Sequence, residues 1–406
     1  MLDVPALRRR FPALDRMQDG RPVVYADGPG GTQVPHDVID AMSGFLARGG
    51  ANLGGPFAAS EETGALVHGA RVAVADLINA SQPEEISFGQ NMTSLTLSLG
   101  RALARTWSPG DEIICTRLDH DANVSSWMTA AAEAGAVVRM VDFDASDGRL
   151  DPSAIADALT ERTRLVAVTH ASNAIGSIVD VGAVVAAAHE RDALVFVDAV
   201  HYTPHGLVDV VQTGCDFLAA SAYKFFGPHT GLLYGRIELM AEIDAVKIRP
   251  APEEPPGKWE TGTQSFESLA GVAAAVDYLA SLGRGETRRS QLVDAMNRVQ
   301  AHERRLSERF IAGMTALDAV RLFGIPTPDG RTPTFAVGVA GHSPRDVAAH
   351  LGRRGIFVWD GHYYALEVMA ALGVLDAGGL VRIGFVHYNT LDEVDRTVEA
   401  LAELAG

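Results

Sequence analysis

The sequence predicts an α/β protein built on a mostly parallel sheet, and two observations support this fold class. Between about residues 25 and 234, short apolar runs alternate with Ala-rich segments of helical length. Strands that alternate with helices form mostly parallel sheets that helices cover on both faces. Polar residues also follow directly after several apolar runs. In such sheets these residues meet at the carboxyl ends of the strands, where ligands bind.

The apolar runs give six expected strands in this part of the chain. They are Glu112–Thr116, Val137–Val141, Leu165–Thr169, Leu194–Val197, Phe217–Ala220 and Gly231–Tyr234. Two of the helices between them are expected at Ser125–Ala134 and Val181–Glu190. A Pro-rich stretch at residues 249–257 is expected to be a loop, because proline lacks the N–H that helices and central strands use.

Further elements are expected in the C-terminal part of the chain. Two helices are expected first, near Ser268–Ser281 and Glu286–Ala312. They are followed by the expected strands Thr334–Val339, Ile356–Trp359 and Val381–Phe385. Ser343 and Thr390 each begin a sequence typical of a helix start, so we expect one helix before the second of these strands and one at the end of the chain.

The length of the chain favours a division into two domains, because 406 residues exceed what one hydrophobic core usually accommodates. We predict a large domain over residues 25–284 and a smaller α+β domain over residues 285–406. Residues 1–24 are expected to form an N-terminal segment that packs on the small domain.

Composition and charge argue against several function classes. The formal net charge of −17 opposes binding to nucleic acid or to acidic membrane surfaces. No stretch reaches the ~20 uninterrupted apolar residues of a membrane span, and the first residues lack a signal-peptide pattern, so we expect a cytoplasmic location. Cys115 and Cys215 lie in apolar stretches and are expected to be core residues rather than a disulfide. No metal site is expected.

Lys224 lies in the turn sequence Ser221–Gly231, downstream of the apolar run that ends at Asp198. A lysine in a polar turn is usually a solvated charge, and an aspartate after a strand is often a turn former. Together, an acid at a strand end and a downstream lysine are the two protein groups that pyridoxal phosphate requires. The amine holds the cofactor covalently and the carboxylate keeps its ring nitrogen protonated, so we expect this cofactor.

Taken together, the motifs of the chain resemble the class V aminotransferase family, and within it the cysteine desulfurase-like branch of the SUF type. Seven motifs carry the resemblance, in the family's order: Tyr25–Thr32, Leu118–Asn123, Leu165–Asn173, Val197–His201, Ser221–Gly231, Thr261–Thr263 and Val381–Thr390. The resemblance implies pyridoxal phosphate fold type I, with a large domain around a sheet of the seven-stranded type. It also implies a small amino-acid substrate and a homodimer with a shared active site.

The resemblance also implies roles for residues around the cofactor. Lys224 would hold the cofactor and act as base or acid at Cα, Asp198 would pair with the ring nitrogen, and His120 would stack on the ring and move protons. His201, which replaces a glutamine of the family, and Asn173 are expected at the phenolic oxygen. Phosphate donors are expected from Asn91, Met92, Thr93, Ser221 and Tyr223, and from Thr263 supplied by the other subunit.

The expected substrate-binding residues come from three regions. Arg382 is expected to hold the substrate α-carboxylate, because a guanidinium matches a carboxylate in bidentate fashion, and Asn173 is a second candidate. Gly55 lies in a Gly-rich loop that lines the substrate pocket in the family. An aromatic wall around the substrate side chain is expected from Trp359, His362, Tyr363 and Tyr364.

The chain departs from the SUF-type pattern at a position that matters for the chemistry. The family carries a sulfur-accepting cysteine in the string Gly-His-His-Cys-Ala, whereas this chain has Tyr364 there, within Gly361–Ala365. A phenol cannot form a persulfide, because that chemistry needs a thiolate. Trp359 stands where the family has an arginine, which favours a bulkier or less acidic substrate side chain.

The leading hypothesis is a pyridoxal phosphate enzyme that acts on an α-amino acid by β-elimination, as a C–S or C–Se lyase without a protein persulfide. The same residues would also serve a class V aminotransferase or an amino-acid epimerase, and the sequence does not separate these outcomes. The missing cysteine argues against a sulfur-transfer partner protein. Retention of Lys224, Asp198, His120 and Arg382 argues against a non-catalytic scaffold.

Overall fold

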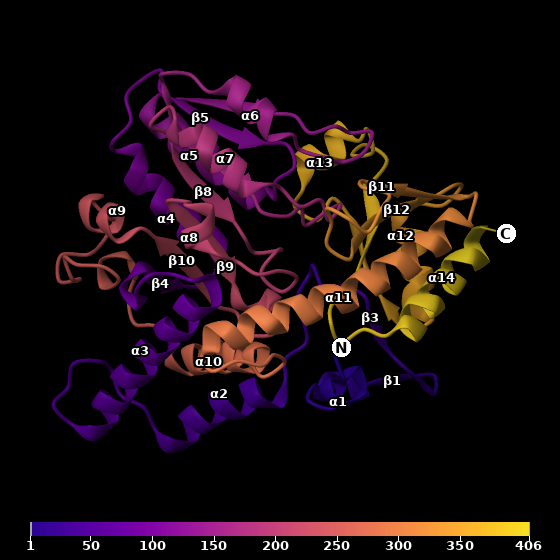
Figure 1. The fold of residues 1–406 in the computed structure, drawn as a ribbon, viewed down its shortest axis with the longest axis horizontal. Coiled ribbons are helices and arrows are strands. Elements are labelled where there is room, and N and C mark those ends of the chain that lie inside the picture. The colour runs from indigo at the N-terminus through magenta and orange to yellow at the C-terminus, as the bar shows by residue number, and fades with distance from the viewer. Residues whose placement is uncertain (1, 406) are drawn as a thin grey trace.

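A seven-stranded sheet forms the centre of the larger part of the molecule in the computed structural model, which describes residues 2–405 (Figure 1). The strand order is β4-β10-β9-β8-β7-β5-β6. Strands β5 to β9 pair with one another only in parallel, whereas β10 runs antiparallel to both of its neighbours. The bounds are β4 Ile86–Gly89, β5 Glu112–Thr116, β6 Val137–Val141, β7 Thr163–Thr169, β8 Leu194–Asp198, β9 Phe217–Ser221 and β10 Gly231–Gly235. The predicted α/β fold with a mostly parallel sheet is confirmed.

Both faces of this sheet are buried under helices, which explains why its strands are almost continuously apolar. Successive side chains of a strand point to opposite faces. Ile113 therefore belongs to the core beneath α4 and α5, and Ile114 to the core beneath α3, α7 and α10. The helices around the sheet are α2 His36–Arg48, α3 Ala58–Ile78, α4 Met92–Ala104, α5 Ser125–Ala134, α6 Pro152–Ala158, α7 Val181–His189, α8 Val210–Thr213, α9 Ile237–Glu242 and α10 Phe266–Ala280.

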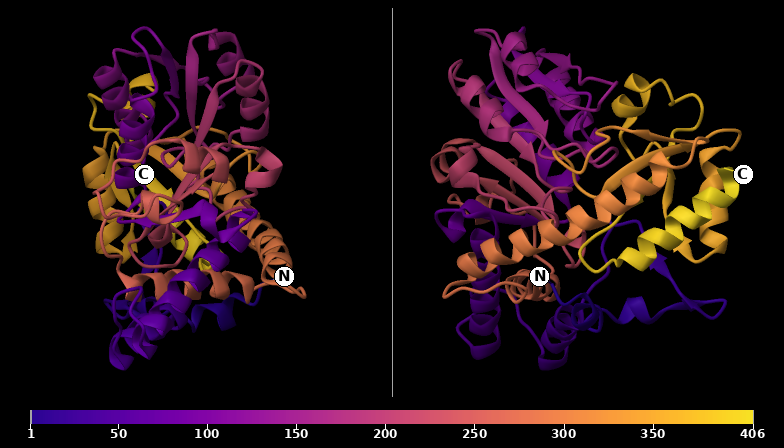
Figure 2. Two further views of the ribbon diagram at one scale, coloured as in Figure 1. Left: turned by 90° about the vertical axis from the view of Figure 1, so that its left-hand side faces the viewer. Right: turned by 45° about the vertical axis from the view of Figure 1, so that its right-hand side comes forward.

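A second, four-stranded antiparallel sheet lies beside the first (Figures 1 and 2). Its order is β11-β12-β15-β14, and its core contains Phe310, Phe335 and Phe385. Thr390 precedes the closing helix as expected, and Val394 and Leu401 of that helix are buried in the same core. The elements are β11 Val320–Phe323, β12 Thr334–Val339, α12 Pro344–Arg353, β14 Trp359–Gly361, α13 Leu366–Ala371, β15 Leu380–Gly384 and α14 Leu391–Ala405.

Several strands differ from expectation, among them the short strands β1 (Met17–Gln18), β2 (Arg21–Pro22) and β3 (Val24–Tyr25) near the N-terminus, which were not expected. The predicted strand Ile356–Trp359 is wrong, because the chain divides there into β13 (Ile356–Phe357), which pairs with β3, and β14, which joins the second sheet. β4 and β11 were not expected, and each has only four residues. A run this short that includes serine, glycine or arginine carries little apolar signal, so only the pairing partner defines it as a strand.

Helix α11 (Arg288–Thr315) runs from one sheet to the other, as the long orange helix in Figure 2 shows. Near its start, Leu292 and Met296 pack in the core of the large sheet, and near its end, Phe310 and Met314 pack in the core of the second sheet. A helix with buried residues at both ends fixes the two sheets relative to each other.

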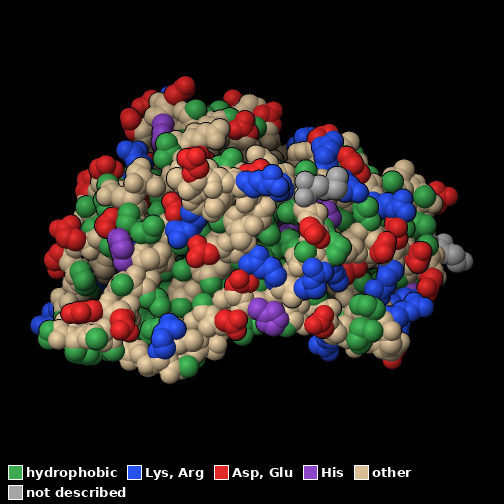
Figure 3. Space-filling model, turned by 60° about the horizontal axis from the view of Figure 1, so that its bottom comes forward, with side chains coloured by type: hydrophobic (Ala, Val, Ile, Leu, Met, Phe, Trp, Pro, Cys, Tyr) green, Lys and Arg blue, Asp and Glu red, His purple; other side chains and the backbone are tan. Residues whose placement is uncertain are grey.

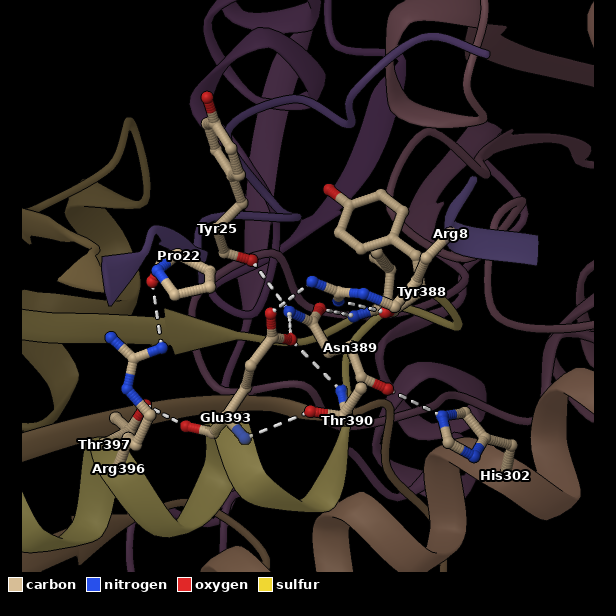
Figure 4. A network of polar contacts seen from close by, with 11 residues as sticks. Arg8, Pro22, Tyr25, His302, Tyr388, Asn389, Thr390, Glu393, Arg396 and Thr397 are labelled. Atoms are coloured by element: carbon tan, nitrogen blue, oxygen red, sulfur yellow. Dashed lines mark hydrogen bonds and ion pairs between the residues drawn. The ribbon is translucent and has the colours of Figure 1, made fainter. Parts of the chain in front are cut away.

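The N-terminal segment is fastened by a polar network that Figure 4 shows. Arg8 of α1 (Val4–Arg8) donates to the carbonyl oxygen of Tyr388 at 2.7 Å and pairs with Glu393 of α14 at 2.9 Å. The Glu393 carboxylate also accepts from the Asn389 side chain at 2.9 Å and from the Thr390 backbone N–H at 3.1 Å. Further along, β1 (Met17–Gln18) and β2 (Arg21–Pro22) form a short hairpin before β3.

The surface carries more acidic than basic side chains, in line with the net charge of −17. On the face that Figure 3 shows, the two kinds are interspersed. Among residues 2–405, no helix combines the length and the apolar composition that crossing a membrane would require.

We expect Glu393→Ala to lower the free energy of unfolding by about 3 kcal/mol, because Arg8 and Asn389 would lose their common acceptor inside the protein. Glu393 is only 5% exposed, so water does not replace the lost carboxylate. The matched control is Arg396→Ala on the same helix, which removes an exposed hydrogen bond from Arg396 to the Pro22 carbonyl. This variant should change the free energy of unfolding by about 0.5 kcal/mol or less. Thermal unfolding followed by circular dichroism measures both; equal unfolding midpoints for the two variants would contradict this reading.

Candidate active site

A cavity of about 910 Å³ lies at the carboxyl ends of β5, β7, β8 and β9, where the second sheet meets the first. The structure brings most of the sequence-predicted site residues to its wall. These residues are Asn91, Met92, Thr93, His120, Asn173, Asp198, His201, Ser221, Tyr223, Lys224, Trp359, Tyr364 and Arg382.

Three predicted residues do not line this cavity. The backbone N–H of Gly55 donates to the Ser60 hydroxyl at 2.8 Å in a loop before α3. His362 is exposed, and its Nδ1 accepts from the backbone N–H of Tyr364 at 3.2 Å. Thr263, expected from a second subunit, lines an adjoining cavity of about 490 Å³.

Lys224 ends a single 3₁₀ turn directly after β9, and its Nζ donates to the carbonyl oxygen of Pro29. Burial, together with the positive charge of Arg382, lowers the pKa of Lys224 to about 7, although Asp27 and Asp198 oppose the shift. A substantial fraction of this amine is therefore uncharged near neutral pH, which makes it a nucleophile and a base. The whole sequence contains only three lysines, the others being Lys247 and Lys258.

Asp198 is the last residue of β8 and is 4% exposed. One carboxylate oxygen accepts from the Val200 backbone N–H at 2.9 Å, and burial raises the pKa of Asp198 to about 6. No cationic side chain within residues 2–405 forms an ion pair with it. A buried carboxylate of this kind suits a ligand that brings its own positive charge, such as a protonated ring nitrogen.

His120 precedes another 3₁₀ turn, Asp121–Asn123, and its Nδ1 accepts from the Ala122 backbone N–H at 3.0 Å. Its proton therefore lies on Nε2. Burial, with the charges of Lys224 and Arg382, lowers the pKa of His120 to about 4, so the ring is neutral. It stacks on the Tyr364 ring at a centroid distance of 5.6 Å and an interplanar angle of 23°. A flat neutral ring with a single N–H donor can cover a ligand ring or donate to a leaving group.

Arg382 lies in β15 and is 4% exposed. It pairs with Asp27 at 3.2 Å, donates to the Asn173 carbonyl at 3.2 Å, and lies over the Tyr363 ring at 4.8 Å. Its Nε is buried without a hydrogen-bond partner in the described part of the chain, as is the side-chain oxygen of Asn173. Asp27 balances the charge of the guanidinium, and the free N–H leaves it able to bind a carboxylate.

His201 and the start of α4 hold the remaining predicted donors. The Nε2 of His201 lies 3.1 Å from the hydroxyls of both Thr332 and Thr334, and burial holds its pKa well below the usual range. A contact from His201 to a ligand oxygen would therefore use Nδ1. The Met92 backbone N–H, proposed as a phosphate donor, instead donates to the Ser221 hydroxyl at 3.1 Å.

The N-terminus of α4 remains an anion site although Met92 is engaged. The side chain of Asn91 caps the helix by accepting from the Ser94 backbone N–H at 2.9 Å. The backbone N–H of Thr93 lies in the first turn, where the helix dipole favours negative charge. Tyr223 lines the same cavity, and its ring stacks on that of His229 at 4.9 Å.

Sequence reasoning missed the residues that act through tertiary contacts. Asp27 lies in a motif that was recognised, but its pairing with Arg382 joins positions far apart in the chain. Thr332 and Thr334 carry no motif, and only the fold places their hydroxyls at His201. The scarcity of lysine was a signal available in the sequence that singles out Lys224.

Comparison with known proteins identifies relatives over the whole chain. The model of the aminotransferase class-V family matches residues 24–397. A probable cysteine desulfurase of Streptomyces coelicolor is 33% identical, covering 99% of this chain and 97% of the relative. The aminotransferase-like protein FGM3 of Gibberella zeae is 32% identical, covering 97% and 96%. The apo structure of a cysteine desulfurase from Thermococcus onnurineus NA1 superposes with a TM-score of 0.89 at 28% identity, covering 100% and 98%.

Proposed function

The chain belongs to the class V aminotransferase family, and we propose that it removes a sulfur or selenium substituent from Cβ of an α-amino acid without forming a protein persulfide. It is a cysteine desulfurase-like enzyme that depends on pyridoxal phosphate. The observation that carries the proposal is Tyr364, which stands at the cavity where the SUF-type pattern has its sulfur-accepting cysteine.

The two cysteines of the chain cannot take over that role. Cys115 and Cys215 are both buried, and neither lines the cavity. Burial raises the pKa of Cys115 well above its usual range and that of Cys215 to about 12. Both therefore remain thiols at neutral pH, and sulfur acceptance needs a thiolate. This argues against a sulfur-transfer role for the protein.

The residues of the cavity fit the cofactor. Asp198 is a buried carboxylate without a cationic partner and would hold the protonated ring nitrogen. Lys224 would hold the cofactor covalently, His120 would cover the ring, and Thr93 with Tyr223 would bind the phosphate at the start of α4. When bound, pyridoxal phosphate withdraws electrons from Cα of an attached amino acid and so acidifies the Cα hydrogen.

Three side chains around the substrate Cα would carry out the other steps of the reaction. Arg382 binds the α-carboxylate and orients the substrate. Once the amino group of the substrate has taken its place, the amine of Lys224 would be free and uncharged and would take the Cα proton, as its lowered pKa of about 7 permits. The Cβ–S bond breaks with its electron pair on sulfur, and the Nε2–H of the neutral His120 donates to the leaving thiolate. Hydrolysis of the remaining fragment gives pyruvate and ammonia.

We expect the holoenzyme to release pyruvate and a free thiol in equal amounts from S-alkyl cysteines, and to lose about 10³-fold in rate with Lys224→Ala, because that variant lacks the base at Cα. The substrates to compare are S-alkyl cysteines, L-cysteine and cysteine sulfinate, with pyruvate, alanine, thiol and sulfide measured in parallel.

Other product patterns would contradict β-elimination. Alanine and sulfide from free cysteine would mean that desulfuration survives with Tyr364 in place of the thiol. A keto acid that retains the sulfur would identify an aminotransferase, and exchange of the Cα hydrogen with solvent without bond cleavage would identify an epimerase.

We infer further that the active site is completed in a homodimer. Thr263 lies in an exposed segment that lines the smaller cavity. This cavity shares four lining residues with the larger one, namely Gln90, Ser94, Leu97 and His229. Val246 and Ile248 nearby along the chain are exposed apolar side chains, which suits a surface that a second copy covers. The proposed role of Thr263 is to donate to the phosphate bound by the neighbouring subunit.

Mixed subunits test this shared site. In a dimer of one Lys224→Ala subunit and one Thr263→Ala subunit, one of the two sites receives an intact lysine and an intact threonine. Random mixing should therefore recover about a quarter of the wild-type activity per subunit, above the activity of either parent. Activity equal to the average of the two parents would mean that each chain builds its site alone.

A further inference from the structure

Two aromatic residues of the cavity wall, Trp359 and Tyr364, have no role in the reaction steps described above. Tyr364 and Trp359 both line the cavity, yet they are 68% and 57% exposed. Within residues 2–405, neither the Tyr364 hydroxyl nor the Trp359 indole N–H has a hydrogen-bond partner. Two large aromatic side chains left open at a binding cavity are surfaces for a ligand rather than parts of the core.

The strand register places Trp359 next to the group assigned to the substrate carboxylate. Trp359 of β14 lies directly opposite Arg382 of β15 in the antiparallel pairing. Residues opposite each other project to the same face of a sheet, with Cβ atoms about 5 Å apart. The indole therefore flanks the guanidinium, and the side chain of a substrate held by Arg382 lies within reach of the aromatic wall.

Tyr364 is held over the cavity by its backbone. Its carbonyl oxygen accepts from the Asp121 backbone N–H at 2.6 Å, and its ring stacks on His120. Tyr363 and Tyr364 have φ values of 50° and 56°, a conformation that non-glycine residues rarely adopt. The surrounding contacts thus hold the Tyr364 backbone at Asp121 and its phenol ring against His120, despite the unfavourable local conformation.

Asp121 is a carboxylate of the cavity wall that has no cationic partner. Its side chain accepts from the Ser125 hydroxyl at 2.8 Å, and in the described part of the chain no lysine, arginine or histidine pairs with it. The other acids of the cavity have assigned roles, because Asp27 pairs with Arg382 and Asp198 is proposed to hold the ring nitrogen of the cofactor. Asp121, by contrast, has neither a cationic partner in the described part of the chain nor a proposed role toward the cofactor, so its carboxylate is available to the substrate.

We propose that Asp121, Trp359 and Tyr364 form a subsite for a positively charged group on the substrate side chain. This subsite rests on the proposed function, because it assumes that Arg382 and Lys224 fix the backbone atoms of an amino-acid substrate. Aromatic faces attract cations, and a carboxylate beside them supplies the opposite charge. The substrate class is a β-substituted alanine, such as an S-substituted cysteine, whose substituent ends in an ammonium or quaternary ammonium group.

Three ligands of nearly equal size and different charge test the subsite on the holoenzyme. They are S-(2-aminoethyl)-L-cysteine, S-propyl-L-cysteine and S-carboxymethyl-L-cysteine, which carry a cationic, a neutral and an anionic end. Affinity is measured as ligand-induced change in thermal stability over a concentration series, and kcat and KM are measured separately. We expect the aminoethyl ligand to bind roughly ten-fold more tightly than the propyl ligand, and the carboxymethyl ligand to bind most weakly.

Two substitutions show whether Asp121 causes the preference. Asp121→Asn keeps the shape and the hydrogen bond from Ser125 and should bring the aminoethyl and propyl ligands to equal affinity, acting on KM more than on kcat. Asp121→Lys should reverse the order in favour of the carboxymethyl ligand. Asp192→Asn, at an exposed aspartate outside the cavity, is the matched control and should leave the order unchanged.

Equal affinity of the three ligands for the wild-type protein, or an order that Asp121→Asn leaves unchanged, would overturn the subsite. Failure of the proposed function would look different. If the enzyme transaminates or epimerises instead of eliminating, the thermal shifts would still rank the ligands by charge, while thiol release would be absent for all three. If only the subsite is wrong, thiol release would continue without discrimination by charge.

Discussion

Two cationic side chains, Lys224 and Arg382, lie largely buried at one cavity. The rest of the site depends on how the free-energy cost of burying their two charges is offset. Removing an unpaired charge from water is unfavourable, and two like charges in one cavity repel each other. Arg382 keeps its charge through Asp27, the Asn173 carbonyl and the Tyr363 ring. Lys224 sheds its charge more readily, since its pKa is lowered to about 7. Burial, with the charges of Lys224 and Arg382, also lowers the pKa of His120 and keeps its ring neutral. One retained cation, one available base and one neutral donor follow from this single constraint.

This arrangement needs both sheets. Asp198 and Lys224 follow the ends of β8 and β9, whereas Arg382 and Trp359 lie on adjacent strands of the second sheet. The cavity therefore exists only where the two sheets meet, and α11 holds them in that relation by contributing to both cores. Strain in the turn at Tyr363 and Tyr364 is concentrated at this junction, as is common where a structure positions residues for binding.

Much of the fold and of the site could be predicted from the sequence, for reasons that also explain the failures. Buried parallel strands read as apolar runs, so Glu112–Thr116 and Val137–Val141 were placed correctly, and their helices supplied the fold class. Residues after strand ends converge by topology, so His120 and Asp198 could be assigned to one cavity. β4 and the split at Phe357 were missed because only pairing partners define such short strands. The sequence could not show that Asp121 lacks a cationic partner, because only the folded structure shows which side chains lie near it.

The central claim is that the cavity makes Lys224 a reactive amine, and covalent trapping tests it most directly. The protein is mixed with pyridoxal phosphate between about pH 5 and 10, reduced with borohydride and mapped by mass spectrometry, with N-acetyl-lysine as the reference for an ordinary amine of pKa about 10.4. The amine reacts only without its proton, so adduct formation at Lys224 should rise with pH and reach half its maximum near pH 7. Lys247 and Lys258 should carry little or no adduct, which makes the three-lysine chain its own control. Adducts spread over all three lysines, or a half-maximum at Lys224 near pH 10, would contradict the account.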